Sequence, residues 1–273
     1  MLLNASRKAD YDRLVAYLRG KEFQSAMSAR TLRRPVNTDA DVAPAIPKRT
    51  LVELPFPGQA SLIAALLDTF LADVRVPGSS RYVLDLSGSM EGHRINSLKE
   101  AMLLLASNTS VASDHYARFQ NREEVGIITF SSQPSPTVLF QMGSTPAENA
   151  EARASIARFI KPLSSGGATA IYTSVQRALT ELSRERSRGK EKRYYTVVLM
   201  TDGENNRGLD EKQFADWYQS EGDSVRGIPV FPILFGEGSP KELGRLAELT
   251  GGKLFDSRSN TLAAVFKEIR GYQ

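Results

Sequence analysis

From residue 81 to residue 270 the sequence alternates short apolar, β-branched runs with amphipathic stretches of helical period. Strands are expected over residues 81–86, 124–130, 194–200, 230–235 and 253–255. Helices are expected over residues 94–106, 145–160, 171–182, 210–220, 240–249 and 261–270. Strands that alternate with helices form a mainly parallel sheet with helices on both faces. The sequence therefore predicts an α/β fold with a Rossmann-like, doubly wound central sheet.

One further strand departs from this parallel order. Residues 137–141 follow the strand at 124–130 after a short connection rich in serine and proline. Parallel neighbours need a crossover of about a dozen residues, whereas antiparallel neighbours join through a short turn. We therefore expect one antiparallel strand at the sheet edge. The run YYTVVLM at residues 194–200 is the most apolar and β-branched, so we place it near the centre.

The first 79 residues are organised differently. Residues 8–30 predict two helices separated by Gly20, and residues 36–50 are a polar, proline-containing linker or strap. A short strand at 51–54 and an amphipathic helix at 63–74 follow. The expected division is a helical N-terminal extension with its linker (1–50), a strand with a connecting helix (51–79), and the α/β domain (80–273).

Composition excludes several classes of site. The chain has no cysteine, and its two histidines, His93 and His115, argue against an imidazole-rich zinc centre. No apolar run approaches the roughly 20 residues of a membrane span, so we expect no span in this chain. The first 30 residues lack a signal-peptide pattern, and any export signal is expected outside this chain. The charge of +4 is dispersed apart from RERSRGKEKR at 184–193, which we interpret as a solvated helix end, not a nucleic-acid site.

Oxygen-bearing side chains gather where predicted strands end or helices begin. Asp85, Ser87 and Ser89 form a D-x-S-x-S pattern after the first strand of the domain. Thr169 lies in the turn Gly-Gly-Ala-Thr, and Asp202 in the turn Thr-Asp-Gly after the central strand. Ligands of open α/β sheets bind at the carboxyl ends of the strands. Two carboxylates and three hydroxyls make an oxygen-only set that suits Mg²⁺ and leaves room for water and one outside ligand.

The D-x-S-x-S loop has a purely structural alternative, and several enzyme classes also place a serine or an aspartate at a strand end. Serine and aspartate are common in strand-end turns and helix caps, which is the structural alternative for the D-x-S-x-S loop. The sequence contains neither a G-x-S-x-G nucleophile elbow nor a phosphate-binding G-x-x-x-x-G-K-[ST] loop. A phosphatase of the haloacid dehalogenase type would need a second aspartate at the position of Ser87. We therefore expect no enzyme and keep a magnesium-dependent phosphohydrolase as the least favoured alternative.

The three loops resemble the metal-ion-dependent adhesion site of the von Willebrand factor type A family. The resemblance covers roughly residues 80–270 and implies direct cation contacts from Ser87 and Ser89. It implies direct or water-mediated binding by Thr169, and mainly water-mediated binding by Asp85 and Asp202. The cation would be Mg²⁺, with Mn²⁺ or Ca²⁺ as substitutes, and its open position would take an Asp or Glu of a protein partner. Ala168, inserted before the threonine, departs from the family pattern and puts the reach of Thr169 in doubt.

The N-terminal run at 11–36 resembles the helical end of a bacterial extracellular solute-binding domain. This resemblance implies that the chain is the tail of a larger bacterial protein with an extracytoplasmic location. The alternative is a helical appendage that belongs to the type A domain. A second functional hypothesis follows: a sensing or recruiting part of a solute-binding or chelatase-like assembly, in which the metal site joins subunits.

Overall fold

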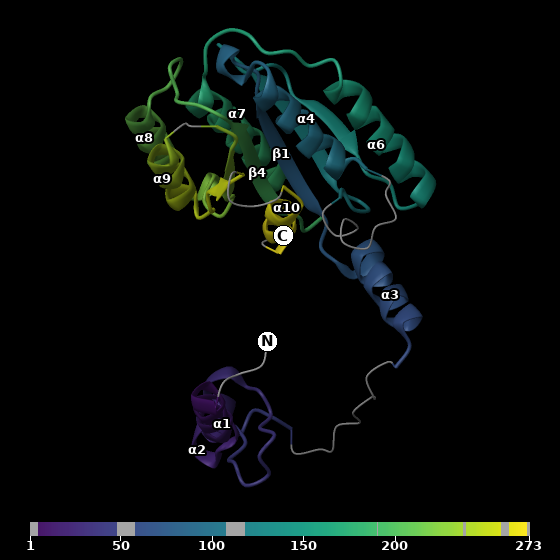
Figure 1. Cartoon of the computed structure of the whole chain (residues 1–273), viewed down its shortest axis with the longest axis vertical. Coiled ribbons are helices and arrows are strands. Elements are labelled where there is room, and N and C mark those ends of the chain that lie inside the picture. The colour runs from purple at the N-terminus through teal and green to yellow at the C-terminus, as the bar shows by residue number, and fades with distance from the viewer. Residues whose placement is uncertain are drawn as a thin grey trace. The chain divides into compact units, whose positions relative to one another are not determined.

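The computed structural model in Figure 1 describes residues 5–47, 58–107, 118–189, 191–236, 239–257 and 262–271. The chain forms two compact units, Met1–Gly58 and Gln59–Gln273. None of the described helices is long and apolar enough to cross a membrane. The strand predicted at 51–54 lies outside the described residues.

The first unit contains the two predicted helices, α1 (Ala5–Arg19) and α2 (Lys21–Thr31), with Gly20 between them. The segment after α2 is tied back to it by side-chain hydrogen bonds. Val36 N donates to Gln24 Oε1 at 2.9 Å, and Ala43 N donates to Ser28 Oγ at 2.9 Å. Because these bonds satisfy backbone groups that no regular element pairs, the polar segment is a strap on α2.

The second unit is built on a six-stranded sheet in the order β3-β2-β1-β4-β5-β6. All neighbours are parallel except β2 and β3, so the predicted antiparallel edge strand is confirmed. The strands are β1 (Gly78–Asp85), β2 (Glu124–Phe130), β3 (Val138–Gln141), β4 (Tyr194–Thr201), β5 (Val230–Leu234) and β6 (Phe255–Asp256).

Helices cover both faces of this sheet, as predicted (Figure 1). On one face Tyr82 and Leu84 pack in a core with α4 (His93–Leu105), α6 (Pro146–Ile160) and α10 (Leu262–Gly271). On the other, Val83 packs with α7 (Ile171–Arg188), α8 (Glu211–Glu221) and α9 (Pro240–Thr250). Alternate residues of β1 thus enter opposite cores, which explains why the run from Tyr82 to Leu84 is apolar on both faces.

The winding of the sheet places two loops side by side at its carboxyl edge. From β1 the chain continues to β2 on one side, whereas β4 pairs with β1 on the other. Sheets of this kind bind ligands where the strand order reverses. The loops after β1 and β4 meet at that point and carry the predicted D-x-S-x-S and Thr-Asp-Gly residues.

The amino edge of the same sheet holds compensated charges. Glu123, 3% exposed, accepts hydrogen bonds at Oε1 from Arg75 and Arg270, both at 2.5 Å. Arg81, 4% exposed on β1, donates to Glu124 at 3.0 Å and Glu185 at 2.8 Å. These carboxylates and guanidiniums form a largely buried polar layer where the strands begin, next to the apolar core.

The helix predicted at 63–74 forms, with two differences. It consists of α3 (Ala60–Thr69) followed by a π-helical turn, η1 (Phe70–Val74). Its apolar positions remain exposed, with Leu66 at 54% and Val74 at 66% of their accessible surface. The amphipathic pattern therefore predicted the helix correctly, although its apolar face finds no core among the described residues.

Candidate metal centre

Asp85, the last residue of β1, forms the buried end of the candidate site. Its carboxylate is fully buried and accepts two hydrogen bonds, from Ser87 N at 2.8 Å and from Thr201 Oγ1 at 2.5 Å. Burial raises the pKa of the Asp85 carboxyl to about 6, against the opposing effect of these two hydrogen bonds. Its ionised form is therefore under-stabilised, and a nearby cation would favour it.

Hydroxyl groups continue from this carboxylate to the surface. Ser87 Oγ lies 3.0 Å from Ser89 Oγ, and Ser89 Oγ donates to Asp202 Oδ1 at 2.9 Å. Ser87 is buried and Ser89 is exposed, so the row of oxygens runs from the core to the rim. The structure thus brings together four of the five residues predicted to bind metal.

The loop that carries Thr169 is hydrogen-bonded to the D-x-S-x-S loop through the backbone. Gly166 N donates to Leu86 O at 2.7 Å, and Gly88 N donates to Gly167 O at 2.9 Å. Gly167 adopts a φ of +89°, a left-handed conformation that glycine accepts without strain. The Gly-rich turn therefore holds two loops that are about 80 residues apart in sequence close together.

Thr169 itself is held by the loop after β4. Its N–H donates to Asn206 Oδ1 at 2.8 Å, and its carbonyl accepts from Asn206 N at 3.0 Å. The inserted Ala168 is fixed separately, because its N–H donates to Ser132 Oγ at 3.1 Å. Thr169 is 3% exposed, and among the described residues its hydroxyl makes no hydrogen bond. The fifth residue therefore belongs to the same loop assembly and has an uncommitted oxygen.

Three contributors escaped the sequence analysis. Thr201 bonds Asp85 directly, Asn206 fixes Thr169, and Arg94 donates to Asp202 Oδ2 at 2.7 Å. Thr201 is the first residue of the Thr-Asp-Gly turn and Asn206 follows that turn by three residues, so the turn was the available signal for both. Arg94 opens a helix after the D-x-S-x-S loop, and nothing in its local sequence distinguishes it from a surface arginine.

The donor chemistry of the cluster fits a hard divalent cation. The five predicted ligands offer only hydroxyl and carboxylate oxygens, and the hydroxyls that would contact a doubly charged ion directly carry no charge that neutralises it. Ser87, Ser89 and Thr169 would hold such an ion by their hydroxyls, with Asp85 and Asp202 behind them. Two further polar residues near these loops, His93 and Glu204, are exposed, and His93 Nδ1 lies 3.2 Å from Ser97 Oγ.

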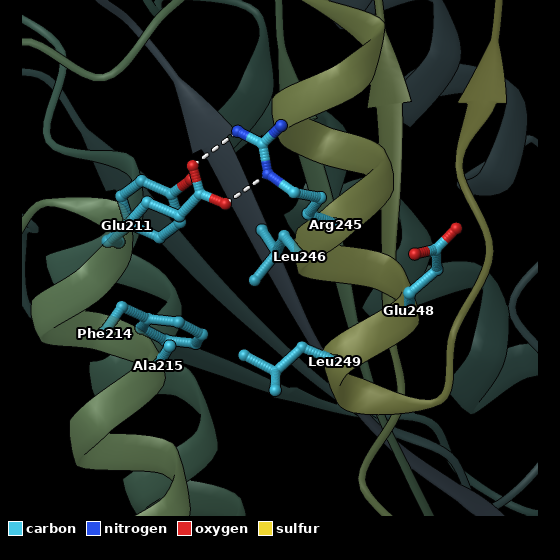
Figure 2. A pocket seen from close by; sticks show the side chains of 8 residues that line it. Glu211, Phe214, Ala215, Arg245, Leu246, Glu248 and Leu249 are labelled. Carbon is cyan, nitrogen blue, oxygen red and sulfur yellow. Dashed lines mark hydrogen bonds and ion pairs between the residues drawn. The ribbon is translucent and has the colours of Figure 1, made fainter.

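A separate hollow of about 280 Å³ lies between α8 and α9 (Figure 2). It is mostly apolar, with Phe214, Leu246 and Leu249 in its lining. Glu211 and Arg245 face each other across it and form a two-bonded ion pair. None of the five predicted metal ligands lines this hollow, and the ion pair ties the two helices together.

Comparison with known proteins assigns the fold to a family. Residues 82–268 match the sequence model of the von Willebrand factor type A domain. Inter-alpha-trypsin inhibitor heavy chain H3 of Homo sapiens is 30% identical over 135 residues, which is 49% of this chain and 14% of that protein. An uncharacterized protein of Synechocystis sp. is 30% identical over 142 residues, 51% of this chain and 28% of its own length. The matched region thus spans a small part of each relative.

Among solved structures, the von Willebrand factor type A protein from Catenulispora acidiphila has a similar fold. It aligns with a TM-score of 0.52 and 19% sequence identity, over 71% of this chain and 42% of that one. At this level of identity the likeness concerns the fold alone.

Proposed function

The chain belongs to the von Willebrand factor type A domain family, and we propose that it binds a divalent cation at the rim of its sheet and uses that cation to dock an acidic residue of a protein partner. The proposed ligands are Asp85, Ser87, Ser89, Thr169 and Asp202, and the proposed cation is Mg²⁺. The family often mediates metal-dependent contacts between proteins, which makes this class of function the first to test.

The observation that carries the proposal is the continuous row of oxygens from Asp85 to Asp202. Its links measure 2.8 Å from Ser87 N to Asp85, 3.0 Å between the two serine hydroxyls and 2.9 Å from Ser89 to Asp202. A strand-end turn that only capped a helix would need one such side chain. This row instead joins the loops after β1 and β4, and it reaches the surface at the exposed Ser89.

Each residue has a distinct part in this proposal. Ser87 and Ser89 present neutral oxygens, so they hold a cation without cancelling its charge. The carboxylates of Asp85 and Asp202 are held in place by Thr201 and Ser89 and supply negative charge from behind. When bound, the cation supplies an electrophilic position that attracts an outside carboxylate. Thr169 closes the set with its uncommitted hydroxyl.

We propose binding and not catalysis, because the carboxylates that could act as bases, Asp85 and Asp202, are engaged by hydrogen bonds from Thr201 and Ser89. His93 is exposed and its Nδ1 faces Ser97, not Ser87 or Ser89. The chelatase-like or solute-binding assembly, the bacterial origin and the extracytoplasmic location stay predictions from resemblance. Hydrolysis of p-nitrophenyl phosphate that requires Mg²⁺ and is lost in Asp85→Asn would contradict the binding role and favour the phosphohydrolase.

Calorimetric titration with Mg²⁺, Mn²⁺ and Ca²⁺ tests the first half of the proposal. We expect one site per chain in the wild type and at least a tenfold weaker affinity in Ser87→Ala, which removes one ligand oxygen. Ser97→Ala, at a partly exposed serine of α4, is the matched control and should bind as the wild type does. Absence of divalent-ion binding at millimolar concentration would contradict the proposal.

Water-proton relaxation of the Mn²⁺-loaded protein tests the second half. A carboxylate that enters the open position displaces a metal-bound water, so added acetate should lower the relaxation enhancement. Acetamide, which has the same shape without the charge, should have little effect at the same concentration. An equal response to both compounds would show that the site does not select carboxylates.

A further inference from the structure

We propose that Arg94 is a built-in counter-cation of the candidate metal centre, which holds Asp202 in the metal-free protein and lowers the affinity for a divalent ion. This inference rests on the proposed function and adds a residue that tunes it. The geometry that points to it is a single guanidinium bonded to both loops of the site.

Arg94 connects the two loops through one nitrogen. Its Nη1 donates to Asp202 Oδ2 at 2.7 Å and to the backbone carbonyl of Ser89 at 3.0 Å. Asp202 receives the hydroxyl of Ser89 on its other oxygen, at 2.9 Å. One carboxylate is thus shared between a proposed metal-binding hydroxyl and a positively charged side chain.

The burial of the two partners is unequal. The Asp202 side chain is 1% exposed, whereas that of Arg94 is 36% exposed. A buried carboxylate needs a counter-charge, and the half-exposed guanidinium supplies it while it remains able to move into solvent. Arg94 can therefore release the Asp202 carboxylate to a metal ion, because its own guanidinium then becomes solvated and is not left buried without a partner.

Arg94 also occupies a position that its own helix disfavours. It is the second residue of α4, and the first turn of that helix contains no acidic residue. The amino end of a helix carries partial positive charge, so a cation there is unfavourable and an anion is preferred. The contact with Asp202 gives a physical reason for an arginine at this position.

The loop after β5 leaves room for this pair. A Cβ at Gly236 would lie 3.0 Å from Asp202 Cβ and 3.1 Å from Arg94 Nε, closer than ordinary contact. Glycine at this position thus lets the backbone pass against both side chains. The pair is therefore enclosed by α4 and by the loops after β4 and β5, and it is not a chance surface contact.

A guanidinium beside a metal ligand acts on the metal in two ways. It repels a divalent ion at short range, and it competes for the Asp202 carboxylate. Repulsion between charges several ångströms apart at a water-exposed rim corresponds to an affinity change of about tenfold. Because this rim is partly exposed, the repulsion should weaken as salt rises to about 0.5 M.

Titration calorimetry of Arg94→Gln with MnCl₂ and MgCl₂ tests the inference. We expect the Kd to fall about tenfold relative to the wild type at low salt, and less at high salt. Arg94→Lys keeps the charge and should stay within about threefold of the wild-type Kd. Arg226→Gln removes an exposed arginine that pairs with Asp223 before β5, and it should leave the Kd unchanged.

The outcomes separate this inference from the proposed function. A wild type that binds metal together with an Arg94→Gln variant of equal or weaker affinity overturns the role of Arg94 alone. Binding by Arg94→Gln when the wild type binds too weakly to measure supports it. Failure of both proteins to bind overturns the metal site and this inference with it. Arg94→Met, a second neutral variant, serves if circular dichroism shows that Arg94→Gln does not fold.

Discussion

Charged side chains are buried at both the amino edge and the carboxyl edge of the sheet, where the strands begin and end. They are paired with opposite charges at the amino edge and only partly paired at the carboxyl edge. At the amino edge, Glu123 is bonded by both Arg75 and Arg270, and Arg81 faces Glu124 and Glu185. At the carboxyl edge, no guanidinium of the described residues bonds Asp85, which receives a hydroxyl and a backbone N–H, and the Arg94 guanidinium that bonds Asp202 is partly exposed.

This difference separates a structural cluster from a candidate binding site. Buried charge that has full counter-charge nearby holds the fold together and has no affinity left for an added ion. Buried carboxylates without full compensation cost folding free energy, and the cost is recovered only when a cation arrives. The pKa values agree with this contrast, because burial raises that of Asp85 to about 6. For Arg270, burial lowers the pKa and Glu123 and Tyr82 more than offset it.

The largest effect is expected at the amino edge, from Glu123→Gln. This substitution removes the carboxylate charge that two buried arginines share, at a cost of about 3–5 kcal/mol in the free energy of unfolding. Urea denaturation and a fall in Tm of about 10 °C would report the loss. The folded variant should keep the divalent-ion affinity of the wild type, since the rim is untouched.

A matched exposed pair controls for the loss of any ion pair. Glu211 pairs with Arg245 at the hollow between α8 and α9, with side chains 42% and 49% exposed. Glu211→Gln should change stability by less than about 1 kcal/mol. If Glu123→Gln and Glu211→Gln destabilise equally, the amino-edge cluster is not the structural counterpart that we infer.

Asp85→Asn should give the opposite pattern: lost metal binding with no loss of stability in metal-free buffer. The carboxyl has a pKa near 3.8 when unperturbed and about 6 in the folded protein. Its ionisation therefore costs up to about 3 kcal/mol of folding free energy, fully present above pH 6 and absent below about pH 4. Asparagine keeps one acceptor oxygen for Ser87 N, and its amide group can donate to Thr201 Oγ1, without that charge.

The measurement is the stability difference between wild type and Asp85→Asn as a function of pH, in EDTA. Carboxyl groups away from the rim are unaffected by the substitution, so the difference reports the charge of the Asp85 site. The wild type should lose stability relative to the variant as the pH rises from about 4 to 6. A difference that does not change with pH would mean that Asp85 is compensated like Glu123.

Local sequence was sufficient for most of the fold and for the five candidate ligands. Periodicity identified the helices and strands, as for α6, whose predicted cap Thr145 accepts from Glu148 N. The five candidate ligands could be named because strand ends and family motifs are both local features, and their role in metal binding stays a prediction. Because β1 and β4 are parallel neighbours, the loops that follow them lie at the same edge of the sheet.

What the sequence did not predict depends on contacts between distant residues. Arg81 was expected only as a strand residue, yet it bonds Glu185, 104 residues away. Gly126 on the adjacent strand makes room for it, since a Cβ there would lie 2.5 Å from Arg81 Cδ. Likewise Thr201 and Asp85 are 116 residues apart, and no periodicity in the sequence reports such a pair.

The smallest predicted effect concerns Thr169, the ligand that the inserted Ala168 put in doubt. Its backbone is fixed by Asn206 and its hydroxyl is uncommitted, which supports a place in the coordination set. Thr169→Ala should weaken Mg²⁺ binding about tenfold, equivalent to about 1.4 kcal/mol. This is less than Asp85→Asn, because only one neutral donor is lost.

Thr169→Ser separates the hydroxyl from the methyl group. The serine keeps the oxygen at the same backbone position, so its Mg²⁺ affinity should stay within about threefold of the wild type. Calorimetric titration of both variants provides the measurement. If Thr169→Ala binds Mg²⁺ as tightly as the wild type, the inserted alanine has moved the fifth oxygen out of reach. The rim would then resemble the amino edge in one respect, with a buried polar residue that serves the fold alone.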